Sequence, residues 1–211
     1  MSRLRTAAAT AALVMAATAC GDGLGEHTAR RIAPAPTPSA SSPTSPSPTL
    51  ATPVAALPRS APVRLRVASI GVDTPLIRLG LQADRTMEVP PDAFPAGWYG
   101  GAPTPGELGP AIIAGHVDWA GRDGVFHDLH RLRPGDEVAV SRADGSTATF
   151  RVERVEQLRK DRFPTDAVYG DIDHAGLRLI TCGGTFDPRA HSYVDNIIVF
   201  ARLVRASPAT R

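Results

Sequence analysis

The sequence predicts an all-β fold, an antiparallel barrel or sandwich of short strands. Apolar Val63, Leu65 and Val67 alternate with less apolar neighbours, which is the period-two pattern of a half-buried strand. Strong helical periodicity is scarce, and 20 prolines and 19 glycines among 211 residues exclude long regular helices over much of the chain. The chain is therefore expected to fold through strands joined by tight turns.

Five further segments have strand patterns and are bounded by turn residues. The dipeptide Asp144-Gly145 favours a hairpin between the segments on either side of it. A short helix is expected at residues 123–132, where apolar residues fall on one face. The expected strands are residues 111–114, 138–140, 147–155, 177–181 and 197–201.

Residues 1–20 have the pattern of an export signal. Arg3 and Arg5 precede an uncharged, alanine-rich run of 14 residues, fewer than the about 20 that a membrane-spanning helix needs. The run ends at Cys20 and resembles a bacterial lipoprotein cleavage box, in which the cysteine is lipidated. Ordinary cleavage near residues 17–19 and a short uncleaved anchor are the alternatives. All three place the rest of the chain outside the cytoplasmic membrane, and an N-terminal lipid or short hydrophobic segment would hold it at the extracytoplasmic face of the cell membrane.

The composition then divides the remaining chain into three parts. Residues 21–62 are expected to be a disordered linker, because residues 34–62 hold nine prolines, ten Ser/Thr and no acidic residue. Such a segment buries too little apolar area to offset its ordering entropy. Residues 63–206 form the expected globular domain, and residues 207–211 a C-terminal tail.

Charge and cysteine count exclude several classes of function. The 23 Lys+Arg against 21 Asp+Glu leave a formal charge of +2, so no basic surface indicates nucleic acid. Two cysteines exclude a disulfide-rich scaffold and a four-cysteine zinc site. The acidic residues of segment 155–176 lack a fixed ligand spacing, so we expect neither a metal nor another cofactor.

Cys182 and His116 are the candidate chemical residues. Cys182 follows a predicted strand and precedes Gly183-Gly184, which leaves room for an approaching backbone. His116 follows the apolar run 111–114, so it is also expected at a strand end. A lone exported cysteine with a distant histidine suits a nucleophile and its base. Spacing alone leaves both catalysis and simple packing of the thiol open.

The run Leu179-Ile180-Thr181-Cys182 resembles the active-site signature of sortases, cysteine transpeptidases of Gram-positive bacteria. The longer pattern through Gly183-Gly184, Phe186-Asp187, Tyr193 and Asp195-Asn196 is similar to actinobacterial class F sortases. The segment Gly115-His116-Val117-Asp118 is similar to the family's histidine segment. The resemblance covers residues 63–204 and implies an eight-stranded β-barrel.

The resemblance also implies a three-residue catalytic site. Cys182 would be the nucleophile and His116 the acid–base residue. The arginine does not carry over directly, because His191 stands at or close to its usual place. Arg189, the one arginine between Cys182 and the last strand, is the candidate, and a solvated loop arginine is the alternative.

Thr181, Gly183 and His191 are the candidate substrate-binding residues beside this site. The implied reaction cleaves a Leu-Pro-x-Thr-Gly-like sorting signal between Thr and Gly and transfers the acyl group to an amine. The implied partners are surface proteins that carry the signal and an amine from a cell-wall precursor or a pilin. We expect a monomer that reaches the membrane through its N-terminus.

Two other functions compete with this interpretation. A stalked surface lipoprotein that binds a glycan or a protein would need no reactive Cys182. An L,D-transpeptidase would also use a cysteine, but its Ser-x-Gly-Cys-type run does not match Thr181-Cys182-Gly183-Gly184.

Overall fold

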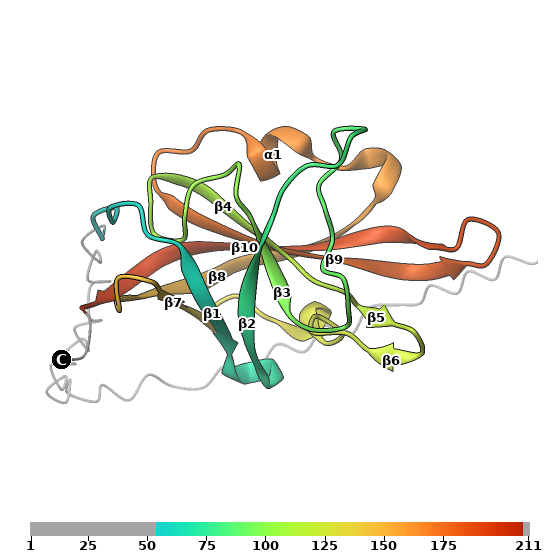
Figure 1. The fold of residues 1–211 in the computed structure, drawn as a ribbon, viewed down its shortest axis with the longest axis horizontal. Coiled ribbons are helices and arrows are strands. Elements are labelled where there is room, and N and C mark those ends of the chain that lie inside the picture. The colour runs from blue at the N-terminus through green and yellow to red at the C-terminus, as the bar shows by residue number, and fades with distance from the viewer. Residues whose placement is uncertain (1–53, 209–211) are drawn as a thin grey trace, which may run out of the picture. The chain divides into compact units, whose positions relative to one another are not determined.

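Eight strands close into a barrel in the order β1-β2-β3-β4-β9-β10-β8-β7 (Figure 1). The computed structural model describes residues 54–208, and in them a separate two-stranded sheet, β5-β6, stands outside the barrel. The all-β class and the eight-stranded barrel are confirmed. The strands are β1 Pro62–Val67, β2 Val72–Leu79, β3 Ala96–Tyr99, β4 Gly109–Ala114, β5 Asp118–Trp119, β6 Arg122–Asp123, β7 Glu137–Arg142, β8 Thr147–Arg159, β9 Ala175–Asp187 and β10 Ser192–Ser207; the helices are α1 Thr165–Tyr169 and 3₁₀ turns at Ala68–Ile70, Leu129–Arg131 and Lys160–Arg162.

The six predicted strands are all present, most of them longer than expected. The hairpin at Asp144-Gly145 is confirmed, since β7 and β8 pair antiparallel around it. Strands β2 and β3 were not expected, because Pro75 interrupts the apolar pattern of one and the other has only four residues. β2 pairs antiparallel with β1 across a short turn and in parallel with β3, which also pairs with β4, so both strands are held by hydrogen bonding to their neighbours and not by an apolar pattern of their own.

The expected helix at residues 123–132 is wrong, although its apolar residues are buried. Only Leu129–Arg131 forms a 3₁₀ turn, and residues 122–123 belong to β6. Gly124 lies so close to the carbonyl of His116 that a Cβ there would overlap it, and the Gly124 amide donates to Val117 at 3.0 Å. These contacts hold the segment in an extended path against residues 116–117, which is incompatible with a helix.

Alternating side chains give the barrel an inner and an outer apolar cluster. The inner cluster draws on all eight strands and includes Ile113, Leu179 and Val199. The outer cluster consists of Ile112, Val168, Ile180, Ile198 and Phe200, so it lies on the other face of β4, β9 and β10. Val168 belongs to α1, which therefore covers this outer face.

Arg178 fastens α1 to the barrel. It is 4 % exposed on β9, its Nε donates to the carbonyl of Ala167 at 3.3 Å, and its guanidinium carbon lies 4.7 Å from the ring centre of Phe200. Burial, with the charge of Arg154 nearby, lowers the pKa of Arg178 to about 10. The group is still charged at neutral pH, so it can keep its bond to the helix.

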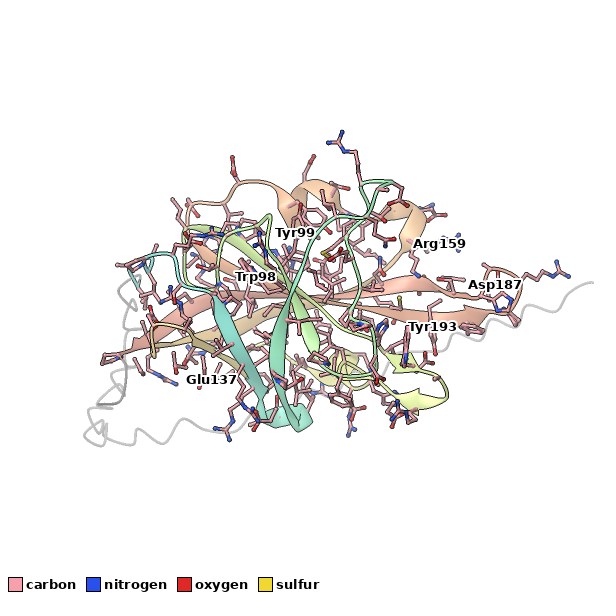
Figure 2. The ribbon with its side chains drawn as sticks, viewed as in Figure 1. Trp98, Tyr99, Glu137, Arg159, Asp187 and Tyr193 are labelled. Carbon is pink, nitrogen blue, oxygen red and sulfur yellow. The ribbon has the colours of Figure 1, made fainter. Side chains whose placement is uncertain are left out.

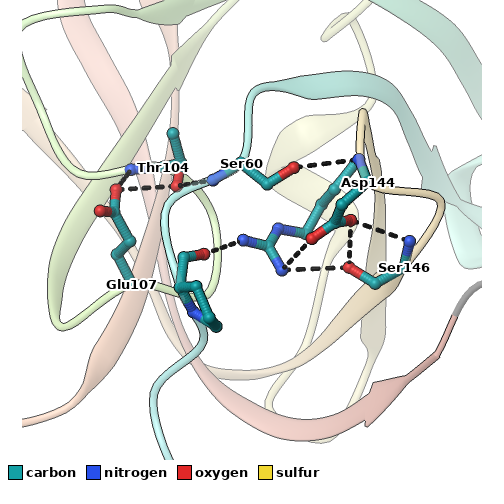
Figure 3. Close-up of polar contacts among 7 residues, drawn as sticks. Ser60, Thr104, Glu107, Asp144 and Ser146 are labelled. Carbon is teal, nitrogen blue, oxygen red and sulfur yellow. Dashed lines mark hydrogen bonds and ion pairs between the residues drawn. The ribbon is translucent and has the colours of Figure 1, made fainter.

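The chain packs on the barrel before the expected boundary at residue 63. Val54 and Leu57 contact the inner cluster, and the Leu57 amide donates to Gly106 at 2.7 Å. The buried Arg142 donates to the carbonyl of Pro58 and, at 3.0 Å, to Ser146 Oγ (Figure 3). Residues 54–61 are therefore part of the domain, because their backbone forms hydrogen bonds with Gly106 and Arg142. The rest of the expected linker lies outside the described residues.

Between residues 54 and 208, no helix combines the length and apolar character that crossing a membrane requires. The expected signal segment and Cys20 lie outside the described residues.

Candidate active site

The register of two neighbouring strands places Cys182 and His116 on one face. Strands β4 and β9 pair in parallel with Ala114 opposite Ile180, and the Gly115 amide donates to the Ile180 carbonyl at 3.1 Å. His116 and Cys182 each stand two residues further along. Because side chains two apart share a face, both continue the outer face of the barrel.

Cys182 lies within a strand and not at its end as predicted, since β9 continues to Asp187. The pairing of β9 with β10 is regular through Cys182 and Gly183 and then shifts at a β-bulge between Tyr193 and Asp195. Gly184 has φ +75°, and a Cβ there would overlap the Asp195 carboxylate. The backbone after the thiol therefore leaves the regular ladder, as bulges near functional sites often do. Cys182 is a free, half-buried cysteine.

Hydrogen bonding sets the tautomer of His116. Its Nε2 lies 2.8 Å from the carbonyl oxygen of Pro90, and a carbonyl only accepts, so Nε2 carries the proton. In the neutral ring Nδ1 is then the nitrogen free to take up a proton. The ring centre of Trp119 lies 4.5 Å away at a 39° tilt. The Phe126 amide donates to the His116 carbonyl at 2.9 Å, so backbone and ring are both held.

Two cavities adjoin these residues, and Cys182 and His116 line both. We call the first the apolar cavity; it has a volume of about 210 Å³ and is lined by Met87, Val89, Pro90, Ala114, Gly115, His116, Phe163, Tyr169, Ile180, Thr181, Cys182 and Asn196. We call the second the polar cavity; it has a volume of about 130 Å³ and is lined by His116, Val117, Asp118, Cys182, Phe186, His191, Ser192 and Tyr193. A thiol and an imidazole thus face two adjoining spaces of different character.

A hydrogen bond across the polar cavity joins β10 to the segment after His116. The Tyr193 hydroxyl donates to Asp118 Oδ2, and the Tyr193 ring packs edge-on against Phe186 at 5.2 Å. In Figure 2, Tyr193 stands on the side of the β9–β10 hairpin that faces β5. The bond to Asp118, then burial and the charges of Asp118 and Cys182, raise the pKa of the Tyr193 phenol. The phenol therefore keeps the proton that makes this bond.

Thr181 and Gly183, on either side of the thiol, differ in their relation to the cavities. Thr181 lines the apolar cavity and is 3 % exposed, yet its Oγ1 has no hydrogen-bond partner among residues 54–208. A buried hydroxyl without a partner is costly unless a ligand supplies one. Gly183 is buried and lines neither cavity; a Cβ there would meet the Ile197 side chain at 2.7 Å.

Arg189 and His191 belong to the turn of the β9–β10 hairpin. The Arg189 amide donates to Asp187 Oδ1 at 2.8 Å, and Figure 2 shows Asp187 near the hairpin tip. The Arg189 side chain is exposed and lines neither cavity. His191 does line the polar cavity and has φ +46°, a left-handed conformation that histidine adopts more readily than most residues. The structure thus brings together Cys182, His116 and His191, and leaves Arg189 exposed in the hairpin turn, outside both linings.

Sequence reasoning missed two residues at the thiol. Asn196 lies directly opposite Cys182 in the β9–β10 pairing and lines the apolar cavity. Counting outward from the turn near residue 189 pairs positions 182 and 196, so the hairpin itself contains this signal. Pro90, which binds the His116 ring, gave no local signal because it lies 26 residues away in a loop.

The described part of the chain holds no cluster of three or more His, Cys, Asp or Glu side chains arranged to bind a metal. The residues at the site offer the chemistry of a thiol, an imidazole and backbone amides.

Comparison with known proteins decides the family. A family model described as the sortase domain matches residues 65–204. The chain belongs to the sortase family. No curated protein sequence matches it.

Solved sortase structures share the fold of this sortase. A lid mutant of sortase A from Corynebacterium diphtheriae is 18 % identical over 72 % of this chain and 74 % of its own, with a TM-score of 0.55. The pilus-related sortase C of Group B Streptococcus is 16 % identical over 71 % and 69 %, with a TM-score of 0.54. Sortase D5 from Clostridium perfringens is 22 % identical over 69 % and 79 %, with a TM-score of 0.51. At these identities the likeness concerns the fold, and family membership makes the chain a sortase transpeptidase.

Proposed function

We propose that this sortase uses Cys182 and His116 to cleave a Leu-Pro-x-Thr-Gly-like signal between Thr and Gly and to join the acyl part to an amine. One observation carries the proposal: both residues line the two adjoining cavities on the outer face of β4 and β9. A substrate that crosses from one cavity to the other passes between thiol and imidazole.

His116 acts through Nδ1 in this proposal. Nε2 is committed to the Pro90 carbonyl, so Nδ1 takes the proton from the Cys182 thiol. The thiolate sulfur then bonds to the carbonyl carbon of Thr. As the carbon–nitrogen bond to Gly breaks, Nδ1 returns the proton to the departing amine and a thioester remains.

The second half of the reaction reverses these steps. An incoming amine bonds to the thioester carbon and gives a proton to Nδ1 of His116. The carbon–sulfur bond breaks and the Cys182 thiolate is restored. Water in place of the amine would yield a carboxylic acid, so exclusion of water by the bound peptide favours transfer.

The character of the cavities supports an assignment of substrate ends. The apolar cavity, with Val89, Phe163 and Ile180 in its wall, suits the Leu-Pro part of the signal. Thr181 in the same wall would bond a polar group of the peptide backbone. The polar cavity, with Asp118 and His191, suits the departing and the incoming amine.

Backbone amides after Cys182 and the guanidinium of Arg189 would stabilise the oxyanion. Arg189 stands two residues from His191 in the turn of the β9–β10 hairpin. In this proposal its long side chain turns toward the thiol once the peptide is bound. Contacts of this kind often tighten only in the substrate complex.

We further propose that the enzyme is exported and held at the extracytoplasmic face of the membrane through its N-terminus, by lipid on Cys20 or by a short anchor. Surface proteins that carry the signal would be its substrates, and a cell-wall precursor or a pilin would supply the amine. Labelling with a fatty-acid analogue tests the lipid; label that persists in Cys20→Ser would contradict it.

The activity is tested with the full chain, a Leu-Pro-x-Thr-Gly peptide and a series of amines. Mass spectrometry is expected to show the transfer product and a thioacyl adduct on Cys182, neither of them formed by Cys182→Ala. Cys20→Ser leaves one cysteine in the chain and makes the adduct's place unambiguous. A wild-type protein that leaves the peptide intact with every amine would contradict the proposal, and a thiol that resists alkylation would favour a binding protein.

A further inference from the structure

A third and larger cavity lies on the same outer face as the site. We call it the distal cavity; its volume is about 780 Å³. Its walls come from the β2–β3 connection and from the region of α1, which both lie over one side of β4 in Figure 1. Tyr99 of β3 and Tyr169 of α1 both contribute to it. Its floor includes Ile112, a buried member of the outer apolar cluster.

The distal cavity continues the apolar cavity. Met87, Phe163 and Tyr169 line both, so these three side chains stand at the border that the two cavities share. Ile112 in the floor of one and Ile180 in the floor of the other belong to the same outer cluster. We call the two adjoining cavities together the trough; both lie over the outer apolar cluster, and the distal part is also lined by Arg85, Thr86 and Asp171.

The strand register gives the trough a direction and a length. Along β4 and the residues after it, the distal cavity is lined by residues between Gly109 and Ile112, and the apolar cavity is lined by Ala114 to His116. The polar cavity begins at His116. From Gly109 to His116 is seven residues, or about 23 Å at about 3.3 Å per residue. An extended Leu-Pro-x-Thr segment spans only about 13 Å by the same measure. The trough is longer than the four signal residues on the acyl side of the scissile bond.

Exposed apolar side chains gather along this trough. Eight large apolar residues are exposed among residues 54–208, and five of them line one of the three cavities. Leu81 and Leu108, at 49 % and 60 % exposure, stand at the distal cavity and at neither of the others. Contiguous exposed apolar surface on a soluble domain marks a binding site.

We propose that the distal cavity binds the substrate residues that precede the Leu-Pro of the sorting signal, and that it favours apolar side chains there. This inference rests on the proposed function, because the proposed chemistry places the acyl part of the peptide in the apolar cavity. About three residues beyond the signal fill the remaining length. A substrate is then recognised by more than its five-residue motif.

The test compares two peptides as substrates of the full chain. Both contain Leu-Pro-x-Thr-Gly; one is preceded by Val-Ile-Val and the other by Ser-Ser-Ser. We expect kcat/KM to be about tenfold higher for the apolar peptide, since burial of apolar side chains supplies the difference. Equal values for the two peptides would overturn this inference and leave the proposed function intact, whereas cleavage of neither would count against the proposed function itself.

Variants locate the effect in the distal cavity. Leu81→Ser and Leu108→Ser are each expected to lower kcat/KM about fivefold for the apolar peptide and less than about twofold for the serine peptide. Val63→Ser is the matched control, because Val63 is 46 % exposed on β1 and lines none of the three cavities. Equal losses for both peptides, or a loss in the control as large as in the variants, would overturn the inference. Thermal unfolding of each variant checks that the fold is retained.

Discussion

The hydroxyl of Tyr193 donates a hydrogen bond to Asp118, and so ties the hairpin after Cys182 to the segment after His116. The two segments are 75 residues apart and are not strand partners. Because Asp118 is two residues from His116 and Trp119 packs on the imidazole, the bond acts on the orientation of the ring. We therefore expect Tyr193 to act as a positioning residue for the proposed reaction.

Removing this bond is expected to slow turnover. Tyr193→Phe keeps the ring against Phe186 but loses the donor, so we expect kcat to fall about tenfold with little change in KM. Asp118→Asn keeps an oxygen that accepts the hydrogen bond, so we expect its kcat to fall less than that of Tyr193→Phe. Steady-state kinetics measures both, and an unchanged kcat in Tyr193→Phe, or an equal loss in the two variants, would contradict the positioning role.

The same bond predicts how the phenol titrates. Asp118 and burial raise the pKa of Tyr193 above the ordinary value of about 10, so the folded state holds the proton more tightly than the unfolded state. The contribution to stability is therefore complete below about pH 10 and is lost as pH rises through the folded pKa. The difference between ultraviolet titrations of wild type and Tyr193→Phe should show a midpoint above 10 that moves down in Asp118→Asn; a wild-type midpoint at 10 or below would refute this.

Thr181→Val should separate stability from activity. The Thr181 Oγ1 is buried without a partner in residues 54–208, so replacing it with a methyl group is expected to raise the free energy of unfolding by about 1 kcal/mol. If the hydroxyl bonds the peptide backbone, KM should rise at least about fivefold in the same variant. Urea unfolding and peptide cleavage are the two measurements. A variant that is more stable and equally active would remove Thr181 from the substrate site.

Arg189 and His191 are distinguished by substitution at each position. If Arg189 stabilises the oxyanion, Arg189→Ala should lower kcat about 100-fold and Arg189→Lys should recover part of the loss. His191→Ala, which removes only a wall of the polar cavity, should affect mainly the KM of the amine. The opposite pattern, with kcat sensitive to His191 and not to Arg189, would transfer the role to the histidine.

Arg142 is expected to hold residues 58–60 on the barrel. Its side chain is 1 % exposed, pairs with Asp144 at 3.4 Å and donates to the Pro58 carbonyl. Arg142→Ala leaves these acceptors without their donor, so we expect the free energy of unfolding to fall by about 2–3 kcal/mol. Arg151→Ala, which loses an exposed pair with Glu137, should cost less than about 1 kcal/mol. Equal urea midpoints for the two variants would contradict the structural role of Arg142.

Local sequence patterns predicted most of the long strands, but not how these strands pair to close the barrel. The strands at Ala111 to Ala114 and Leu177 to Thr181 were predicted because apolar runs between turn residues are a property of short segments. The parallel pairing of these two strands was not predicted, because they are separated by more than 60 residues and their register depends on packing. The helix expected at residues 123–132 failed for a different reason: the close contact of Gly124 with the backbone of His116, in the preceding turn of the chain, overrides the helical periodicity.

The amino-acid sequence by itself determined the candidates for the chemistry, Cys182 and His116, since residue type and the resemblance of the neighbouring motifs to those of sortases are enough to single them out. Only the tertiary structure decided the long-range contacts around them: Pro90 on the imidazole and Tyr193 on Asp118. The physical reason is that each of these contacts joins parts of the chain that meet only when the barrel closes, and no short-range pattern encodes that meeting.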